Sequence, residues 1–159
     1  ALNTSLVGKR SKEAVAIRLK KWLDKAEKKG TKILIGGRLN GVMFEPTLLE
    51  NVDAKLEIYK DEAFGPIAIL EKYQDFEQGI AKINQSRFGL QAGVYTQNLN
   101  TMLYAWDHLD VGGVIINDVP TFRVDNMPYG GVKDSGLGRE GIHSAIRDMQ
   151  EQRLLAIKQ

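Results

Sequence analysis

Short apolar runs alternate with helical patterns through the second half of the chain, and this alternation limits the possible folds most strongly. A helical pattern from Asp75 to Asn84 leads into an apolar run at 92–96, and a second pattern, beginning after Asn98, leads into a run at 114–116. Strands separated by helical patterns of about ten to fifteen residues are typical of crossover connections between parallel strands. The sequence therefore predicts an α/β fold with a mainly parallel sheet and flanking helices.

The remaining elements follow the same two patterns. Apolar residues at helical spacing predict a helix over 11–29, in which Ser11 is the N-cap and Gly30 follows the last turn. A shorter helix is expected over 142–149. Strand-like runs lie at 32–35, 47–52, 67–70 and 153–157. No linker or internal repeat interrupts the chain, so we expect residues 1–159 to form a single domain.

Composition argues against several classes of function. The 159 residues include no cysteine, which removes disulfides, thiolate metal sites and a cysteine nucleophile from this chain and makes the cytoplasm the expected compartment. The net charge is only +2, and the basic residues of 20–29 alternate with acids and lack stacking aromatics, so no nucleic-acid partner is expected. No apolar run is long enough for a membrane span, and no membrane partner is expected.

Three further features of the sequence bear on function. The two histidines, His108 and His143, are distant in sequence and lack clustered acids, so no metal site is expected. The chain starts at Ala1 without a methionine or a signal-peptide pattern, which suggests a cut or engineered start. The long Gly-, Pro- and Asp-containing loop at 118–140 indicates either function or disorder.

The segment from Gly136 to Gly141 matches the dinucleotide fingerprint G-x-G-x-x-G letter for letter. No predicted strand leads directly into it, and the acidic residue that should follow about twenty residues later would lie beyond the C-terminus. We therefore interpret these glycines as residues that let a loop approach the rest of its own fold closely.

The stretch 60–66 combines a carboxylate, an aromatic ring and a bend. Glu62 and Phe64 are two residues apart, which in extended backbone directs both side chains to the same face, and Gly65-Pro66 forces a turn directly afterwards. A ring and an acid held side by side suit a flat heterocycle joined to a sugar diol. Taken alone, the stretch is explained better by a surface acid beside a core phenylalanine. The rest of the chain has to decide between this interpretation and a nucleotide contact.

Taken in order, a series of motifs resembles the aldehyde dehydrogenases. The series comprises Gly36-Gly37, Pro46-Thr47, Glu62 to Pro66, Asn84, Phe88-Gly89-Leu90, Tyr95-Thr96, Ile116-Asn117 and 128–141. The resemblance covers almost the whole chain but only the C-terminal third of such an enzyme. In that family a cysteine thiolate attacks the aldehyde, hydride passes to NAD or NADP, and water activated by a glutamate hydrolyses the thioester. The cysteine, that glutamate and the dinucleotide-binding domain would all lie upstream of Ala1.

The resemblance implies roles for residues of this chain. Glu62 would accept hydrogen bonds from the nicotinamide-ribose hydroxyls, and Phe64 would lie beside the nicotinamide. Four residues would line the substrate tunnel: Asn117, Phe122, Arg123 and Tyr129. Because 122–128 is similar to the branch that acts on lactaldehyde-like, semialdehyde or phosphorylated substrates, the Arg123 guanidinium would pair with an anionic tail. A purely structural contact between Arg123 and Asp125 stays open as the alternative.

Two functional hypotheses follow from these observations. The first is the C-terminal portion of an NAD(P)+-dependent aldehyde dehydrogenase, which acts on a small aldehyde but neither catalyses nor binds the cofactor as an isolated chain. The second is a non-catalytic α/β module that works through dimerisation. Under both, the terminal segment 153–159 would supply an exposed strand that joins subunits into a homo-oligomer.

Overall fold

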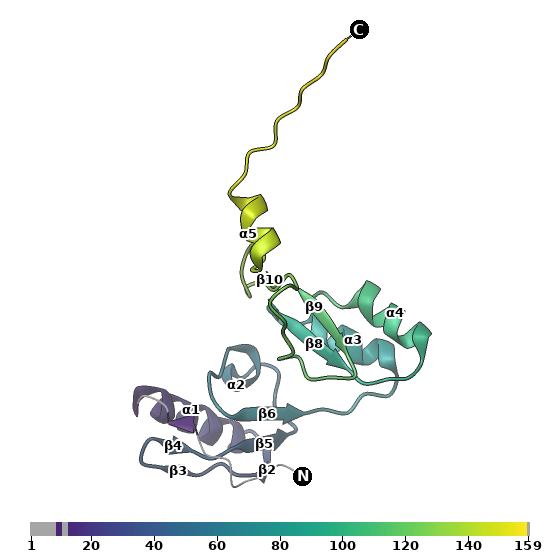
Figure 1. Cartoon of the computed structure of the whole chain (residues 1–159). Coiled ribbons are helices and arrows are strands. Elements are labelled where there is room, and N and C mark those ends of the chain that lie inside the picture. Colours follow the sequence, from purple (N-terminus) through teal and green to yellow (C-terminus); the bar gives the residue numbers. More distant parts are fainter. Residues whose placement is uncertain (1–8, 11–12, 159) are drawn as a thin grey trace. The chain divides into compact units, whose positions relative to one another are not determined.

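The computed structural model describes residues 9–10 and 13–158, and the chain divides into two compact units, Ala1–Tyr73 and Gln74–Gln159 (Figure 1). Each unit buries its own apolar cluster. The sequence predicted one domain because it contains no linker and no repeat. The boundary falls between Tyr73 and Gln74, in the short connection between the strand that ends at Leu70 and the helix that begins at Phe76, and this connection has no linker-like composition.

The first unit is built on one long helix and a three-stranded sheet. The helix α1 (Glu13–Glu27) precedes β2 (Lys32–Ile35), β5 (Thr47–Glu50) and β6 (Ile67–Leu70), which form a sheet in the order β2-β5-β6 (Figure 1). The strand β5 runs antiparallel to β2 and parallel to β6. The residue ranges of β2 and β6 are the predicted ones, and α1 ends at Glu27 rather than at the predicted Lys29. Its expected N-cap, Ser11, lies outside the described residues.

Four short elements of this unit were not predicted. The strands β1 (Lys9–Arg10), β3 (Leu39–Asn40) and β4 (Met43–Phe44) form a small antiparallel sheet in the order β1-β4-β3, and α2 (Glu57–Lys60) is a single turn of helix. Elements of two to four residues cover only about one period of the strand or the helical pattern, which is too short for a repeat to be recognised. Periodicity therefore cannot reveal them.

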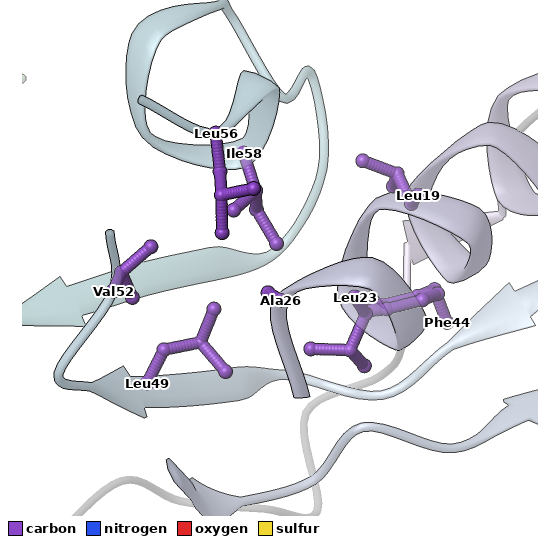
Figure 2. Close-up of a cluster of buried hydrophobic side chains, with 8 residues drawn as sticks. All are labelled: Leu19, Leu23, Ala26, Phe44, Leu49, Val52, Leu56 and Ile58. Carbon is purple, nitrogen blue, oxygen red and sulfur yellow. The ribbon is translucent and has the colours of Figure 1, made fainter. Parts of the chain in front are cut away.

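The core of the first unit joins α1 to the sheet and to α2. Figure 2 shows its eight buried side chains, which come from α1, β4, β5, α2 and the segment before α2: Leu19, Leu23, Ala26, Phe44, Leu49, Val52, Leu56 and Ile58. Leu19, Leu23, Phe44 and Leu49 are fully buried. Burying a leucine or phenylalanine side chain stabilises a fold by about 1.5–3 kcal/mol, so the position of α1 on the sheet is firmly determined.

The second unit contains the crossover that the sequence predicted. The helix α3 (Phe76–Asn84) leads to β8 (Gln91–Val94), and α4 (Leu99–His108) connects β8 to β9 (Gly113–Ile116). The strands β8 and β9 are parallel and pair over four residues each. Their inner faces and the two helices enclose a second buried cluster, which includes Ala92, Val94 and Ala105.

Both helices of this crossover begin at the residues that the sequence indicated. The Asp75 carboxylate accepts a hydrogen bond from the Gln78 amide at 2.7 Å, and the Asn98 side chain accepts one from the Thr101 amide at 3.2 Å. Each side chain satisfies a backbone donor that has no partner within the helix. Capping can be predicted because the donor and the acceptor are only three residues apart.

The last part of the chain departs from the predictions. The strands β7 (Phe88–Gly89) and β10 (Val132–Lys133) form an antiparallel pair, and α5 (Ile142–Asp148) follows. Residues 151–158 form neither helix nor strand, so the predicted strand at 153–157 is absent from the described chain. A strand needs a neighbour for its backbone hydrogen bonds, and none of the described segments pairs with this one.

The α/β class is confirmed, but the mainly parallel sheet is not. Among the described ladders, β5·β6 and β8·β9 are parallel, and the other four are antiparallel. The antiparallel pairs arise mostly from the two-residue strands that periodicity does not detect. Within the described residues, no helix combines the length and the hydropathy that a membrane crossing requires.

Candidate functional site

Glu62 and Phe64 lie in the connection between α2 and β6, and both side chains are exposed. The Phe64 side chain is 65% exposed, so the interpretation of this residue as a core phenylalanine is wrong. The extended backbone expected here is also wrong, because Phe64 has a φ of +51°. A residue with a Cβ is strained in this left-handed region and remains there only when its surroundings hold it.

Contacts from the helix α1 and the strand β5 hold the bend on both sides of Phe64. On one side, the Arg18 guanidinium donates a hydrogen bond to the Ala63 carbonyl at 2.9 Å. On the other, Gly65 lies so close to Leu19 that a Cβ at Gly65 would be 2.4 Å from the leucine Cδ1. The Pro66 carbonyl accepts a hydrogen bond of 2.8 Å from the amide of Thr47, the first residue of β5. The bend is therefore a supported feature of the fold.

The single turn α2, which leads into the bend, is tied to α1 by an ion pair. Lys25 Nζ lies 2.7 Å from Glu57 Oε1, and this hydrogen bond lowers the pKa of Glu57 below its ordinary value of 4.5. Burial raises the pKa of Tyr59, two residues after Glu57. The Glu71 carboxylate, which accepts a hydrogen bond of 3.1 Å from the Tyr59 hydroxyl, raises this pKa further.

The chemistry of the bend suits a nucleoside. Glu62 makes none of the side-chain hydrogen bonds or ion pairs found among the described residues, and a carboxylate only accepts hydrogen bonds. A sugar diol offers two hydroxyl donors to such a group, and the exposed Phe64 ring offers an apolar face to a planar base. Glu62 and Phe64 are therefore candidates for contacts with a sugar diol and a planar base.

A second group of functional side chains forms in the other unit. Arg123 Nη2 lies 3.0 Å from Glu140 Oε2, and the Arg123 guanidinium lies 4.5 Å from the centre of the Tyr129 ring. The backbones of Tyr129 and Glu140 pair as an antiparallel bridge, with the Tyr129 amide donating to the Glu140 carbonyl at 3.0 Å. We call these three residues the Arg123 cluster. The contact with Asp125 that was left open is replaced by one with Glu140.

Sequence reasoning missed Glu140 because it is separated from Arg123 by 17 positions. No periodic pattern spans that distance in an irregular loop. The backbone bridge between Tyr129 and Glu140, which sets the position of Glu140, depends on the path of the whole segment 118–140, which only the folded chain reveals.

Two predicted tunnel residues have other contacts. Asn117 has a φ of +58°, and its side-chain oxygen accepts a hydrogen bond from the Thr96 amide at 2.8 Å, just beyond the ends of β8 and β9. Phe122 is 43% exposed, and its carbonyl accepts a hydrogen bond from Gln91 Nε2 at 3.4 Å. Neither side chain has a recorded hydrogen bond, ion pair or ring contact with Glu140 or Tyr129 in the described part of the chain. Of the four predicted tunnel residues, only Arg123 and Tyr129 come together.

Of the three glycines in 136–141 that the sequence analysis assigned to close packing, only Gly141 is tightly packed, because a Cβ there would lie 3.2 Å from the Met127 carbonyl oxygen. A Cβ at Gly136 would meet nothing within 4 Å and one at Gly138 only Asp148 Oδ2 at 3.8 Å, so the interpretation is wrong for these two, which instead have φ values of +125° and +73°.

Close packing is found at other glycines nearby. A Cβ at Gly112 would lie 1.7 Å from the Gly130 carbonyl oxygen, and one at Gly131 would lie 2.4 Å from the Ser135 Cβ. The loop is also fixed by Ser135, whose hydroxyl accepts the Gly89 amide proton at 2.9 Å. This loop borders a pocket of about 410 Å³ whose lining includes Tyr129 and Glu140. The described residues contain no cluster of three or more acidic, histidine or cysteine side chains suited to a metal ion.

The chain is similar to known proteins of one family. The profile described as "Aldehyde dehydrogenase family" matches residues 4–155. Among curated relatives, a 3-sulfolactaldehyde dehydrogenase of Priestia aryabhattai is 41% identical over 142 residues, which are 89% of this chain and 30% of the relative. A sulfoacetaldehyde dehydrogenase of Neptuniibacter caesariensis is 41% identical over 153 residues, covering 96% of this chain and 34% of the relative. The chain therefore spans about a third of the length of these relatives.

Solved structures lead to the same family. Aldehyde dehydrogenase 21 from Physcomitrella patens, in complex with the reaction product succinate, superposes with a TM-score of 0.85 at 45% identity, covering 87% of this chain and 29% of that one. Glyceraldehyde-3-phosphate dehydrogenase GapN from Methanocaldococcus jannaschii, complexed with NADP, gives a TM-score of 0.79 at 40% identity, covering 86% and 29%. The profile match, the identities and the superpositions agree: the chain belongs to the aldehyde dehydrogenase family.

Proposed function

We propose that this chain is the C-terminal portion of an NAD(P)+-dependent aldehyde dehydrogenase that oxidises an aldehyde to a carboxylic acid. The observation that carries the proposal is the supported bend, which holds an exposed carboxylate and an exposed ring two residues apart in a chain of this family. The cofactor, NAD or NADP, would supply the hydride acceptor when bound. The residues of this chain supply position and orientation.

Glu62 and Phe64 have separate tasks in this proposal. The Glu62 carboxylate accepts hydrogen bonds from the hydroxyls of the nicotinamide ribose and so restricts the rotation of the sugar. The Phe64 ring lies beside the nicotinamide and limits how far it can move from the aldehyde carbon. Hydride transfer depends steeply on the distance and alignment of the reacting atoms, so both residues act on the rate of that step.

The test is a Glu62→Gln substitution in the complete enzyme. The amide is similar in size but replaces one acceptor oxygen with a donor, so it no longer holds both hydroxyls. The rate constant of the pre-steady-state NAD(P)H burst should fall by about tenfold or more, and the dissociation constant of the cofactor should change less. Glu27→Gln, an exposed position at the end of α1, is the matched control. A burst that is unchanged in the Glu62 variant contradicts the proposal.

The Arg123 cluster supports an anionic aldehyde as the substrate. The Arg123 side chain is 45% exposed, and Glu140, its ion-pair partner among the described residues, is 67% exposed, so a substrate carboxylate, sulfonate or phosphate can take the place of the glutamate without a buried charge being left unpaired. The sulfo-aldehydes in the names of two relatives, and the succinate bound to a structural neighbour, carry such groups. Tyr129 holds the guanidinium plane by stacking against it.

The terminal segment 153–159 supports a homo-oligomer. Three of its apolar side chains are almost fully in solvent, with Leu154 at 92%, Leu155 at 82% and Ile157 at 77% exposure. Exposed apolar residues on an extended segment that lacks a neighbouring strand suit pairing with another subunit. The cytoplasm remains the proposed compartment, because the chain has no cysteine to form disulfides.

A further inference from the structure

We propose that Arg18 is a positioning residue for the cofactor contact, because its guanidinium sets the backbone that presents Glu62 and Phe64. The inference rests on the proposed role of Glu62 and Phe64 and adds the residue that fixes the backbone between them. Arg18 belongs to α1 and lies 45 positions before the carbonyl that it binds, so no local sequence signal connects the two.

The Arg18 side chain is itself held in place. Its guanidinium lies 4.5 Å from the centre of the Trp22 ring, one helical turn further along α1, and the side chain is partly buried. Stacking on an aromatic ring restricts the plane of the guanidinium, so its N–H groups point in defined directions. The hydrogen bond to Ala63 therefore starts from a donor of fixed position.

The Ala63 carbonyl is the atom at which such a donor controls Phe64. This carbonyl belongs to the peptide plane between Ala63 and Phe64, and the φ of Phe64 is the rotation of the residue relative to that plane. Holding the oxygen at 2.9 Å therefore helps to hold the φ of +51°. A strained φ of this kind relaxes when the contact that maintains it is lost.

The next residue of α1 acts on the other side of Phe64. Leu19 is fully buried, and a Cβ at Gly65 would lie 2.4 Å from its Cδ1, so any larger residue at this position would force the leucine to shift. Two successive residues of one helix thus hold both neighbours of Phe64. Since α1 is fixed by the core in Figure 2, the bend is set before any ligand arrives, which is the condition for a preorganised contact.

The first experiment uses the chain itself with Arg18→Met, Arg18→Lys and the control Lys21→Met, an exposed lysine of the same helix. The one-bond Cα–Hα coupling of Phe64, measured by NMR, distinguishes positive from negative φ. Arg18→Met should shift the ratio of the two conformers by about tenfold toward negative φ, as expected when one charge-assisted hydrogen bond is lost. Arg18→Lys, whose ammonium can still donate, should keep most of the positive-φ population. Unchanged amide signals in the β2·β5 ladder show that each variant is folded.

The second experiment measures the NAD(P)H burst in the complete enzyme. Arg18→Met should lower the burst rate constant about tenfold and change the cofactor dissociation constant less than threefold, with substantial rescue by Arg18→Lys. A Phe64 coupling that is the same in Arg18→Met and Lys21→Met overturns the inference. The inference is also overturned if the burst rate constant is unchanged in Arg18→Met but reduced in Glu62→Gln. In that case the proposed function still stands. If Glu62→Gln leaves the burst unchanged, the proposed function fails and this inference fails with it.

Discussion

Arg123 and Glu140 form an ion pair with an N–O distance of 3.0 Å, and both side chains are largely accessible to solvent. An exposed pair of this kind contributes only about 0–1 kcal/mol to the stability of a fold. We propose that its importance lies in binding, because the glutamate occupies the guanidinium that an anionic substrate would use. We therefore expect substrate and Glu140 to compete for Arg123.

Arg123→Leu in the complete enzyme should weaken the use of aldehydes that carry a carboxylate, sulfonate or phosphate. The loss of a charge-assisted contact should lower kcat/KM for these substrates by roughly ten- to a hundredfold and leave neutral aldehydes nearly unchanged. Steady-state kinetics with one anionic and one neutral aldehyde provide the comparison, and Arg147→Leu on α5 is the control. An equal decrease of kcat/KM for both substrates would indicate that Arg123 has a structural role.

Glu140→Gln should have the opposite effect on anion binding. Without the competing carboxylate, no ion pair has to be broken before the guanidinium binds an anion. The inhibition constant of succinate should therefore fall by about two- to fivefold. Inhibition by a non-reacting dicarboxylate does not depend on turnover, which separates this effect from any change in catalysis. A higher inhibition constant would show that Glu140 helps rather than competes.

The Lys25–Glu57 pair predicts a pH dependence of stability in the first unit. Because the folded-state pKa of Glu57 is lowered, its contribution is fully present above the ordinary value of 4.5 and is lost as the pH falls through the folded-state pKa. Lys25→Met should therefore reduce the stability at pH 7 and make it less sensitive to acid below pH 4.5. Urea unfolding at a series of pH values measures this, with Lys29→Met as the control. Parallel pH profiles for the two variants would be the contrary result.

The purified chain should form no NAD(P)H from an aldehyde, since it contains no cysteine to act as nucleophile. Absorbance at the NAD(P)H band, with a complete aldehyde dehydrogenase as positive control, tests this, and calorimetric titration should detect no micromolar binding of NAD. Turnover that persists after repeated purification would contradict the prediction. The coding sequence upstream separates an enzyme portion from a non-catalytic module: only the former predicts a frame with a nucleotide-binding domain and a catalytic cysteine.

Replacing Leu154 and Leu155 by aspartate should lower the oligomeric state of the chain. The two side chains are 92% and 82% exposed, so the folded units lose no packing of their own when the charges are introduced. Sedimentation velocity measures the change, and replacing Gln150 and Gln152 by aspartate is the matched control for added charge. An oligomer that survives only in the control supports the terminal segment as an interface, and one that survives in both variants excludes it.

Much of the fold could be predicted because its signals are local. The strands at 32–35 and 67–70 and the caps Asp75 and Asn98 depend on residues within a few positions of one another. The two-residue strands, the single turn α2 and the division into two units could not be predicted. Short elements have no period, and a division between cores depends on which apolar faces meet.

The sequence by itself determined the family and indicated Glu62 and Phe64 as the candidate cofactor contacts, because both inferences depend on the order of residue types along the chain. Only the tertiary structure decided how the pair is presented. The positive φ of Phe64 and its control by Arg18 arise from contacts across 45 positions, and the partner of Arg123 lies 17 positions away. Such contacts are chosen by the packing of whole elements, which outweighs the local preference of any single residue for its backbone conformation.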